Sequence, residues 1–327
     1  MPKAKRPRFG SMGVWPRKRA NRPYARVRSW AKKPTASFLG FPGYKAGMTH
    51  IIVTDTRKNS ITKGLEISIP ATVIECPPMR ILQLRFYHNT YEGQNPATQF
   101  FFKSEPEVQR KINVPKKAAI AADLDKIKLE SYTEMRVVVY TQPKLIGLKK
   151  KPEVFELALG GKMADQLAFV KQHLDKDILV KDIFQEGHLL DIHAVTRGKG
   201  YQGSIKRFGI GLKMHKTEKG IRRVGTLGGW QGHAHFIHRV AHPGQMGYHQ
   251  RVQYNLQILK ISDKPEEINP KGGWPHYGVV TSTYLVIKGS IPGAKKRMVL
   301  MTQAIRPTRD IPLPTIEHIS LQSKQGR

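Results

Sequence analysis

The spacing of hydrophobic positions changes along the chain, and these changes outline the expected architecture. In residues 41–100, short β-branched or alternating apolar runs stand between turn signals. This pattern predicts strands at residues 51–53, 71–74 and 81–86. Strand character returns towards the end of the chain, at residues 189–195, 252–261, 279–287 and 298–301.

The middle of the chain has a different period. Apolar residues recur every three or four positions in residues 118–128 and 154–174, and Pro152 stands where a helix start tolerates proline. Strand-rich ends around a helical middle predict an α+β fold, in which a β-barrel is interrupted by an inserted α-helical region. We expect the first part of the barrel in residues 41–100, the helical insert in 101–187 and the rest of the barrel in 188–327.

Residues 1–40 carry no core pattern. Prolines and basic residues alternate there with Phe9, Trp15, Tyr24 and Trp30, and few aliphatic side chains are present, so the segment cannot fold alone. One interpretation is a solvated basic tail. The interleaved aromatic and basic residues favour the other, an arm whose rings stack on bases and whose cations pair with phosphates.

Residues 196–251 form a second segment without a core pattern. It holds 12 glycines between Gly198 and Gly247, and seven histidines lie between His193 and His249. A loop of this length is functional or disordered in most compact domains, and glycine allows close approach to another backbone. We predict an extended finger that is ordered when RNA surrounds it.

Charge supports a polyanionic partner. The 327 residues include 56 Lys+Arg and 24 Asp+Glu, a formal net charge of +32. The first 54 residues hold 13 basic residues and no acid, and residues 192–262 hold 12 basic residues and one acid. Residues 55–191 are near neutral, with 21 basic and 18 acidic residues. Two basic segments around a balanced body favour nucleic acid, because each neutralised phosphate releases counterions.

Other partners and compartments fit the sequence less well. There is no apolar run of 18 residues and no signal-peptide pattern, which argues against a membrane partner. The single cysteine, Cys76, allows neither an intramolecular disulfide nor a cysteine-based zinc site. We interpret the chain as a cytoplasmic protein of a reducing compartment.

Two local motifs suggest chemistry. The sequence GKGYQG at residues 198–203 matches the dinucleotide-binding fingerprint, but the following helix is expected to be short and basic, ending at Gly209, and the only nearby acid is Glu218. A glycine-rich turn that binds RNA phosphates through backbone N–H groups and Lys199 is the favoured alternative.

The second motif is a histidine cluster at residues 233–249, which raises the possibility of zinc. Its spacing is not that of a closed structural site, and no HExxH sequence or adjacent carboxylate accompanies it. Contacts with bases or phosphates explain the same residues. No catalytic set has a recognisable signature, so we predict no enzyme, no cofactor, no metal and no small-molecule substrate.

Several longer motifs carry a family resemblance. GKGYQG at residues 198–203, LGGW at 227–230 and PGQMGYHQR at 243–251, together with GFPGYKAGMT at 40–49, resemble the universal large-subunit ribosomal protein L-three family over nearly the whole chain. The length and residues 246–249 resemble its archaeal branch. Eukaryotic relatives carry a Thr-His-Arg-Gly run where this chain has TEKG at 217–220, so a role of that histidine does not transfer.

The resemblance implies a translation-protein-type β-barrel with an inserted helical region, a basic N-terminal arm and a central finger. It implies a structural protein of the large ribosomal subunit that binds its RNA, promotes early assembly and contacts neighbouring ribosomal proteins. In the family the finger tip carries a tryptophan near the peptidyl transferase centre, and Trp230 is the matching residue. An enzyme using the glycine-rich loop or the histidines, and a free nucleic-acid-binding protein, are the alternatives.

The candidate RNA-binding residues are those with cationic, aromatic or hydrogen-bonding side chains in the arm, the finger and the start of the body. They are Lys3, Lys5, Arg6, Arg8, Trp15, Arg17, Lys18, Arg19, Arg22, Arg26, Arg28, Trp30, Lys45, Arg197, Lys199, Lys206, Arg207, Lys213, His215, Lys216, Arg222, Arg223, Trp230, His233, His235, His238, Arg239, His242, Gln245, Tyr248, His249 and Arg251.

Overall fold

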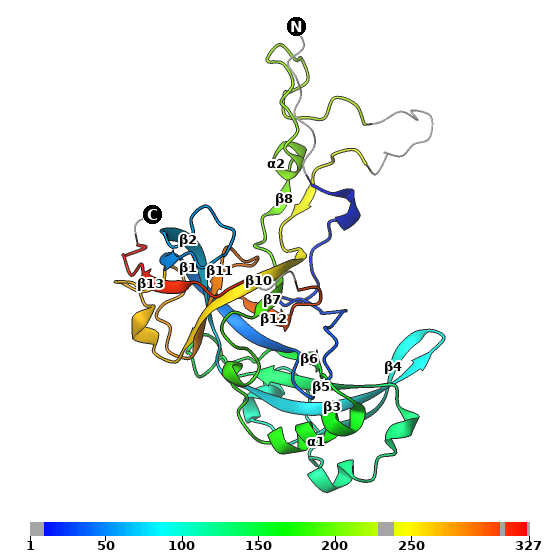
Figure 1. Cartoon of the computed structure of the whole chain (residues 1–327). Helices are drawn as coiled ribbons and strands as arrows, with labels where there is room; N and C mark the ends of the chain where they lie inside the picture. The colour runs from blue at the N-terminus through cyan, green and yellow to red at the C-terminus, as the bar shows by residue number, and fades with distance from the viewer. Residues whose placement is uncertain (1–9, 228–238, 308–310, 326–327) are drawn as a thin grey trace. The chain divides into compact units, whose positions relative to one another are not determined.

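The computed structural model describes residues 10–227, 239–307 and 311–325 and divides the chain into two compact units. Unit 1 joins Met1–Pro23 with Val195–Arg251, and unit 2 joins Tyr24–Ala194 with Val252–Arg327. Figure 1 shows the path of the chain. The arm expected to end at residue 40 is therefore divided at Pro23.

A seven-stranded sheet forms much of unit 2. Its strand order is β12-β7-β10-β11-β2-β1-β13, and β12 also pairs with β1. Because of this extra pairing, six strands form a closed ring in which each strand pairs with the next, in the order β12, β7, β10, β11, β2 and β1. The bounds of the seven strands are β1 Gly40–Thr54, β2 Glu66–Glu75, β7 Leu189–Val195, β10 Gln250–Ser262, β11 Tyr284–Lys288, β12 Met298–Gln303 and β13 Thr315–Ile319.

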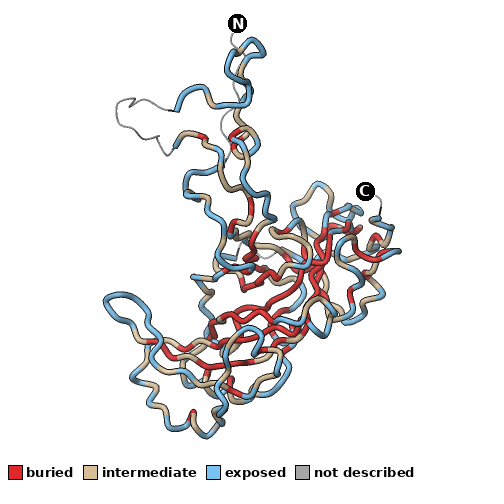
Figure 2. Tube along the Cα trace, turned by 180° about the vertical axis from the view of Figure 1, so that it is seen from behind, coloured by how far each residue is buried: buried red, intermediate tan, exposed pale blue. Residues whose placement is uncertain are grey.

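Strands β11 and β12 are nearly continuous apolar runs because both of their faces are buried. In β11, Leu285 and Ile287 join one hydrophobic cluster, while Tyr284 and Val286 join a second one. Successive side chains of a strand point to opposite faces, so such a strand has no polar face. Figure 2 shows that the buried positions of unit 2 follow its strands.

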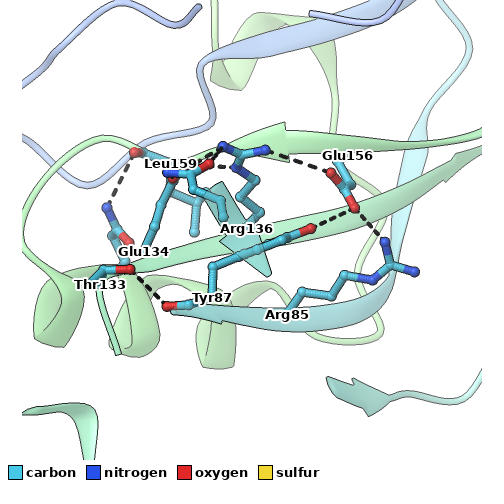
Figure 3. Close-up of polar contacts among 9 residues, drawn as sticks. Arg85, Tyr87, Thr133, Glu134, Arg136, Glu156 and Leu159 are labelled. Carbon is cyan, nitrogen blue, oxygen red and sulfur yellow. Dashed lines mark hydrogen bonds and ion pairs between the residues drawn. The ribbon is translucent and has the colours of Figure 1, made fainter. Parts of the chain in front are cut away.

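A second, four-stranded sheet has the order β4-β3-β5-β6. Its strands are β3 Met79–Thr90, β4 Gly93–Phe101, β5 Glu134–Thr141 and β6 Val154–Ala158. A polar network crosses β3, β5 and β6 (Figure 3), where Glu156 accepts hydrogen bonds from Arg85 and, at 2.8 Å, from the Tyr87 hydroxyl. Arg136 donates to Glu134 at 2.7 Å and its guanidinium lies 5.0 Å from the centre of the Tyr87 ring.

The prediction of a helical region in residues 101–187 is wrong for most of its length. Only α1, Met163–His173, is an α-helix there, and the expected helix at 118–128 is reduced to the 3-10 turn Ala121–Leu124. The first residues of the 154–174 segment form β6, because they pair with β5 from Tyr140↔Val154 to Arg136↔Ala158. Burial against the cores overrides a helical spacing that short segments cannot stabilise alone.

Short 3-10 turns connect the elements elsewhere. They are Met12–Val14, Pro106–Arg110, Leu129–Ser131, Val180–Asp182 and Pro265–Glu267. The strand expected at 279–287 begins later, at Tyr284, because the backbone N–H groups of Thr281 and Ser282 donate to the buried carboxylate of Glu75 at 2.7 and 2.9 Å. Strands β4, β5 and β13 were not predicted.

Unit 1 contains little regular structure. Strands β8, Gly200–Gln202, and β9, Gly244–Met246, form an antiparallel ribbon, and α2, Ser204–Phe208, follows β8 directly. The short basic helix expected at this point is confirmed. It ends at Gly209, whose φ of 66° is the left-handed conformation that glycine adopts easily.

Candidate nucleic-acid interface

The β8–β9 ribbon brings the two glycine-rich motifs together. Tyr201 pairs with Gln245, and the Lys199 N–H donates to the Met246 carbonyl at 3.0 Å. Gly247 has a φ of 71°, and a Cβ there would lie 2.1 Å from the Arg197 carbonyl oxygen. Only glycine fits at position 247, where the backbone passes close to the Arg197 carbonyl. The motif at 198–203 is thus one strand of an antiparallel ribbon, which differs from the parallel strand–turn–helix of a dinucleotide site.

A small aromatic core lies next to the ribbon. Phe208 is 1% exposed, its ring centre lies 5.6 Å from that of Trp15, and the Arg17 guanidinium lies 4.6 Å from the Phe208 ring centre. Arg207 donates to the carbonyls of Gln245 (3.1 Å) and His242 (2.9 Å). These side chains connect the β8–β9 ribbon to helix α2 and to the N-terminal segment around Trp15 and Arg17.

The N-terminal segment is bound to the second motif through His249. Its ring Nδ1 lies 2.8 Å from the Lys18 carbonyl oxygen, and its backbone N–H donates to the Thr196 hydroxyl at 3.1 Å. The Ala20 N–H donates to the Tyr248 carbonyl at 2.8 Å, and the Arg19 guanidinium lies 5.3 Å from the Tyr248 ring centre. Burial lowers the pKa of His249 below its usual value, and nearby arginines add to this effect.

Three of the four interleaved aromatic residues have partners inside the protein, while Phe9 lies outside the described residues, and stacking on bases stays a prediction for the half-buried Trp15 and Trp30. Trp15 contacts Phe208 in unit 1. In unit 2, Tyr24 is 8% exposed and its hydroxyl donates to the Val154 carbonyl at 2.8 Å, while Trp30 packs against the larger hydrophobic cluster. The partners of Trp15 and Tyr24 lie in distant segments, which the sequence around these rings did not indicate.

The predicted cations, in contrast, lie mostly at the surface. The exposed candidates are Lys18, Arg19, Arg22, Arg26, Arg28, Arg197, Lys199, Lys206, His215, Lys216, Arg222, Arg223 and Arg239. The half-buried ones are Trp15, Arg17, Trp30, Arg207, Lys213, His242, Gln245, Tyr248 and Arg251. Candidates Lys3, Lys5, Arg6, Arg8, Trp230, His233, His235 and His238 lie outside the described residues.

Two candidates are directed into the protein. His249 is 8% exposed and binds Lys18 as described above. Lys45 is also 8% exposed, and its ammonium donates to the carbonyl of Ile291 at 2.7 Å. Burial lowers the pKa of Lys45. Both side chains therefore have structural partners, which the cationic composition of their neighbourhoods did not indicate.

Other kinds of site find little support in the described ranges. No group of three or more His, Cys, Asp or Glu side chains within them is placed to hold a metal ion. None of the helices they contain is long and apolar enough to cross a membrane. Cys76 is a buried free thiol, and burial raises its pKa.

The protein combines a body of β-sheets with a glycine-rich segment that carries exposed cations. This combination is typical of structural proteins that bind nucleic acid. The family model for ribosomal protein L3 matches residues 1–326. Among the similar proteins, "Large ribosomal subunit protein uL3" of Methanocaldococcus jannaschii is 43% identical over 331 residues, covering 98% of each chain. The protein of the same name from Archaeoglobus fulgidus is 43% identical over 98% of this chain and 99% of its own, and that of Methanothermobacter thermautotrophicus is 42% identical over 98% of both.

The chain belongs to the ribosomal protein L3 family. It is a ribosomal protein and not an enzyme, and the resemblance to archaeal members is confirmed.

Proposed function

We propose that this chain is a structural constituent of the large ribosomal subunit, in which its basic arm and finger bind large-subunit ribosomal RNA. The observation that supports this most is the placement of side chains in unit 1. Aromatic rings such as Trp15 and Phe208 pack inside, while Lys18, Lys199 and Lys206 are exposed. Exposed cations on an otherwise self-contained segment suit contacts with the phosphate backbone.

The finer architecture belongs to the same proposal. The ring of six paired strands corresponds to the translation-protein-type β-barrel, residues 1–40 to the arm and residues 196–251 to the finger. Residues 101–187 are the insert, with the mixed strand and helix content described above. Neighbouring ribosomal proteins contact the body, and the protein promotes early subunit assembly.

The role of the finger tip rests on the family resemblance alone. We propose that Trp230 lies near the peptidyl transferase centre and that the finger supports the geometry of the RNA there. His233, His235 and His238 would then contact the same RNA.

Co-sedimentation tests the proposed function. The purified full chain should join large subunits that lack it and remain bound in high salt, and it should bind double-stranded DNA only weakly under the same conditions. Equal retention on DNA would instead support a free nucleic-acid-binding protein and overturn the proposal.

A further inference from the structure

A third basic stretch, which holds no acid, lies in the sheet body. Residues 268–309 hold seven Lys+Arg and no Asp or Glu. The part of this stretch that the structure describes includes two loops of unit 2. Residues 269–283 precede β11 and are named loop A here, and residues 289–297 connect β11 to β12 and are named loop B.

Each loop is held by a buried charge from the strands beneath it. Lys45 of β1 donates from its ammonium to the loop B carbonyls of Ile291 (2.7 Å) and Gly293 (3.4 Å). Glu75 of β2, 1% exposed, accepts from loop A, where the Tyr277 hydroxyl and the N–H of Thr281 are donors. A buried charged group is costly unless it is hydrogen-bonded, so these contacts hold both loops against the strands.

The two loops are also joined to each other. The Lys295 ammonium in loop B donates to the Pro275 carbonyl in loop A at 2.9 Å. The residues that follow these two in sequence are Lys296 and His276. The Lys296 N–H donates to the Lys45 carbonyl at 3.0 Å, so its backbone is fixed by the same strand. Lys296 and His276 therefore lie next to the two residues through which the loops are joined.

Lys296 and His276 share an unusual conformation. Their φ angles are 68° and 63°, in the left-handed region that is unfavourable for residues with a Cβ, and both are exposed. Each is the third residue of a four-residue turn, closed by the Tyr277 N–H on the Trp274 carbonyl at 3.0 Å and by the Arg297 N–H on the Ala294 carbonyl at 3.2 Å. These turns present a cation and an imidazole to solvent from two loops that the hydrogen bond between Lys295 and Pro275 joins.

We infer that Lys296 and His276 form a contact for the phosphate backbone of large-subunit RNA on the sheet body, separate from the arm and the finger. This inference rests on the proposed function. Within the described residues, no salt bridge involves Lys271, Lys288, Lys295 or Lys296. Glu75 is buried beneath loop A, so it does not oppose an incoming phosphate.

Phosphate fits this surface better than a base does. Trp274 of loop A is 2% exposed and Tyr277 donates to Glu75, so neither ring is presented for stacking. The remaining groups are N–H donors and positive charge, which position RNA without reading its sequence. The contact should therefore contribute to affinity and to its salt dependence, and not to base preference.

The test compares full-length variants in binding to large-subunit RNA at several salt concentrations. Lys296→Gln should reduce the slope of log K against log salt by roughly 0.7–0.9, the contribution of one phosphate contact. The matched control is Lys126→Gln, because Lys126 is exposed but already paired with Asp123 at 3.2 Å. The control should keep the wild-type slope. Both variants should keep the base preference of the wild type.

A second variant separates binding from folding. Lys296→Gly removes the ammonium and relieves the left-handed strain, so its melting temperature should not fall while its slope falls as in Lys296→Gln. His276→Gln should weaken binding in the same direction. Wild-type slopes in both Lys296 variants would overturn the inference, whereas a wild-type chain that does not bind the RNA would overturn the proposed function itself.

Discussion

The ring Nδ1 of His249 lies 2.8 Å from the carbonyl oxygen of Lys18, 231 residues earlier in the chain. This contact joins the N-terminal segment to the motif at 243–251, and the Ala20 N–H donates to Tyr248 beside it at 2.8 Å. The base of the finger thus has partners within the protein. The dependence of the arm and finger on RNA for their order stays a prediction, and at this junction the chain itself also provides contacts.

Loss of the His249 contact should loosen the N-terminal segment without unfolding the body. In the His249→Ala variant, the Lys18 carbonyl loses its partner, and trypsin should cleave after Lys18 and Arg19 several-fold faster than in the wild type. His249→Asn is the control, because its amide N–H can reach the same carbonyl. Equal cleavage rates in all three proteins would show that the contact does not restrain the segment.

The crossing at Gly247 should not tolerate a side chain. Gly247→Ala places a Cβ 2.1 Å from the Arg197 carbonyl oxygen at a φ of 71°, so the β8–β9 ribbon must shift. We expect faster amide exchange throughout the ribbon and a local cost of about 1–3 kcal/mol. Gly198→Ala is the control, since its Cβ would meet Tyr248 at an ordinary 3.6 Å. Unchanged exchange in Gly247→Ala would contradict the geometry.

Acid should destabilise the body through His193. Burial lowers the pKa of this histidine, which is 5% exposed, although Asp191 acts in the opposite direction. Below the unfolded pKa of about 6.5, the unfolded chain therefore binds more protons than the folded one. Its contribution to stability is present above that pH and is lost as the pH falls towards the folded pKa, by up to about 1.4 kcal/mol per pH unit.

Urea unfolding between pH 5 and 7 measures this effect. His193→Gln should show a weaker decline of the unfolding free energy with falling pH than the wild type does. His318→Gln, at an exposed position of β13, should retain the wild-type decline. The idea fails if the two variants behave alike.

Exposed lysines of unit 1 should dominate the salt dependence of RNA binding. A triple variant, Lys18→Gln, Lys199→Gln and Lys206→Gln, should reduce the slope of log K against log salt by roughly 2–3. A control with the same charge change replaces three lysines of unit 2 that are already paired with Asp or Glu. They are Lys126, Lys144 and Lys181. If the control loses as much slope as the triple variant, net charge and not local contact explains the binding.

Substitutions measure the contribution of the arm's lysines to RNA binding better than deletion of the arm does. Removing residues 1–33 would also remove Tyr24 and Trp30, which pack in unit 2, and the Lys33 carbonyl that accepts from the Gly161 N–H at 2.9 Å. A change of slope in the deleted chain would then mix lost phosphate contacts with a damaged body.

The sequence determined several features of this protein directly. Continuous apolar runs such as residues 298–301 specify buried strands because burial on two faces leaves no polar position. The two basic segments, which hold a single acid between them, specify a polyanionic partner, since charge acts through composition and needs no particular fold. Gly209 specified the end of α2, because a left-handed helix cap is a local property of the backbone.

Tertiary structure alone decided the rest. Residues 154–158 became strand β6 because β5 lies beside them, which their helical spacing could not reveal. Trp15, Tyr24 and Lys45 found partners far away in sequence, so their roles depend on which segments meet and not on their neighbours. The left-handed conformations of His276 and Lys296 belong to local turns, but only the tertiary structure joins the two loops that carry them, through the hydrogen bond from Lys295 to Pro275.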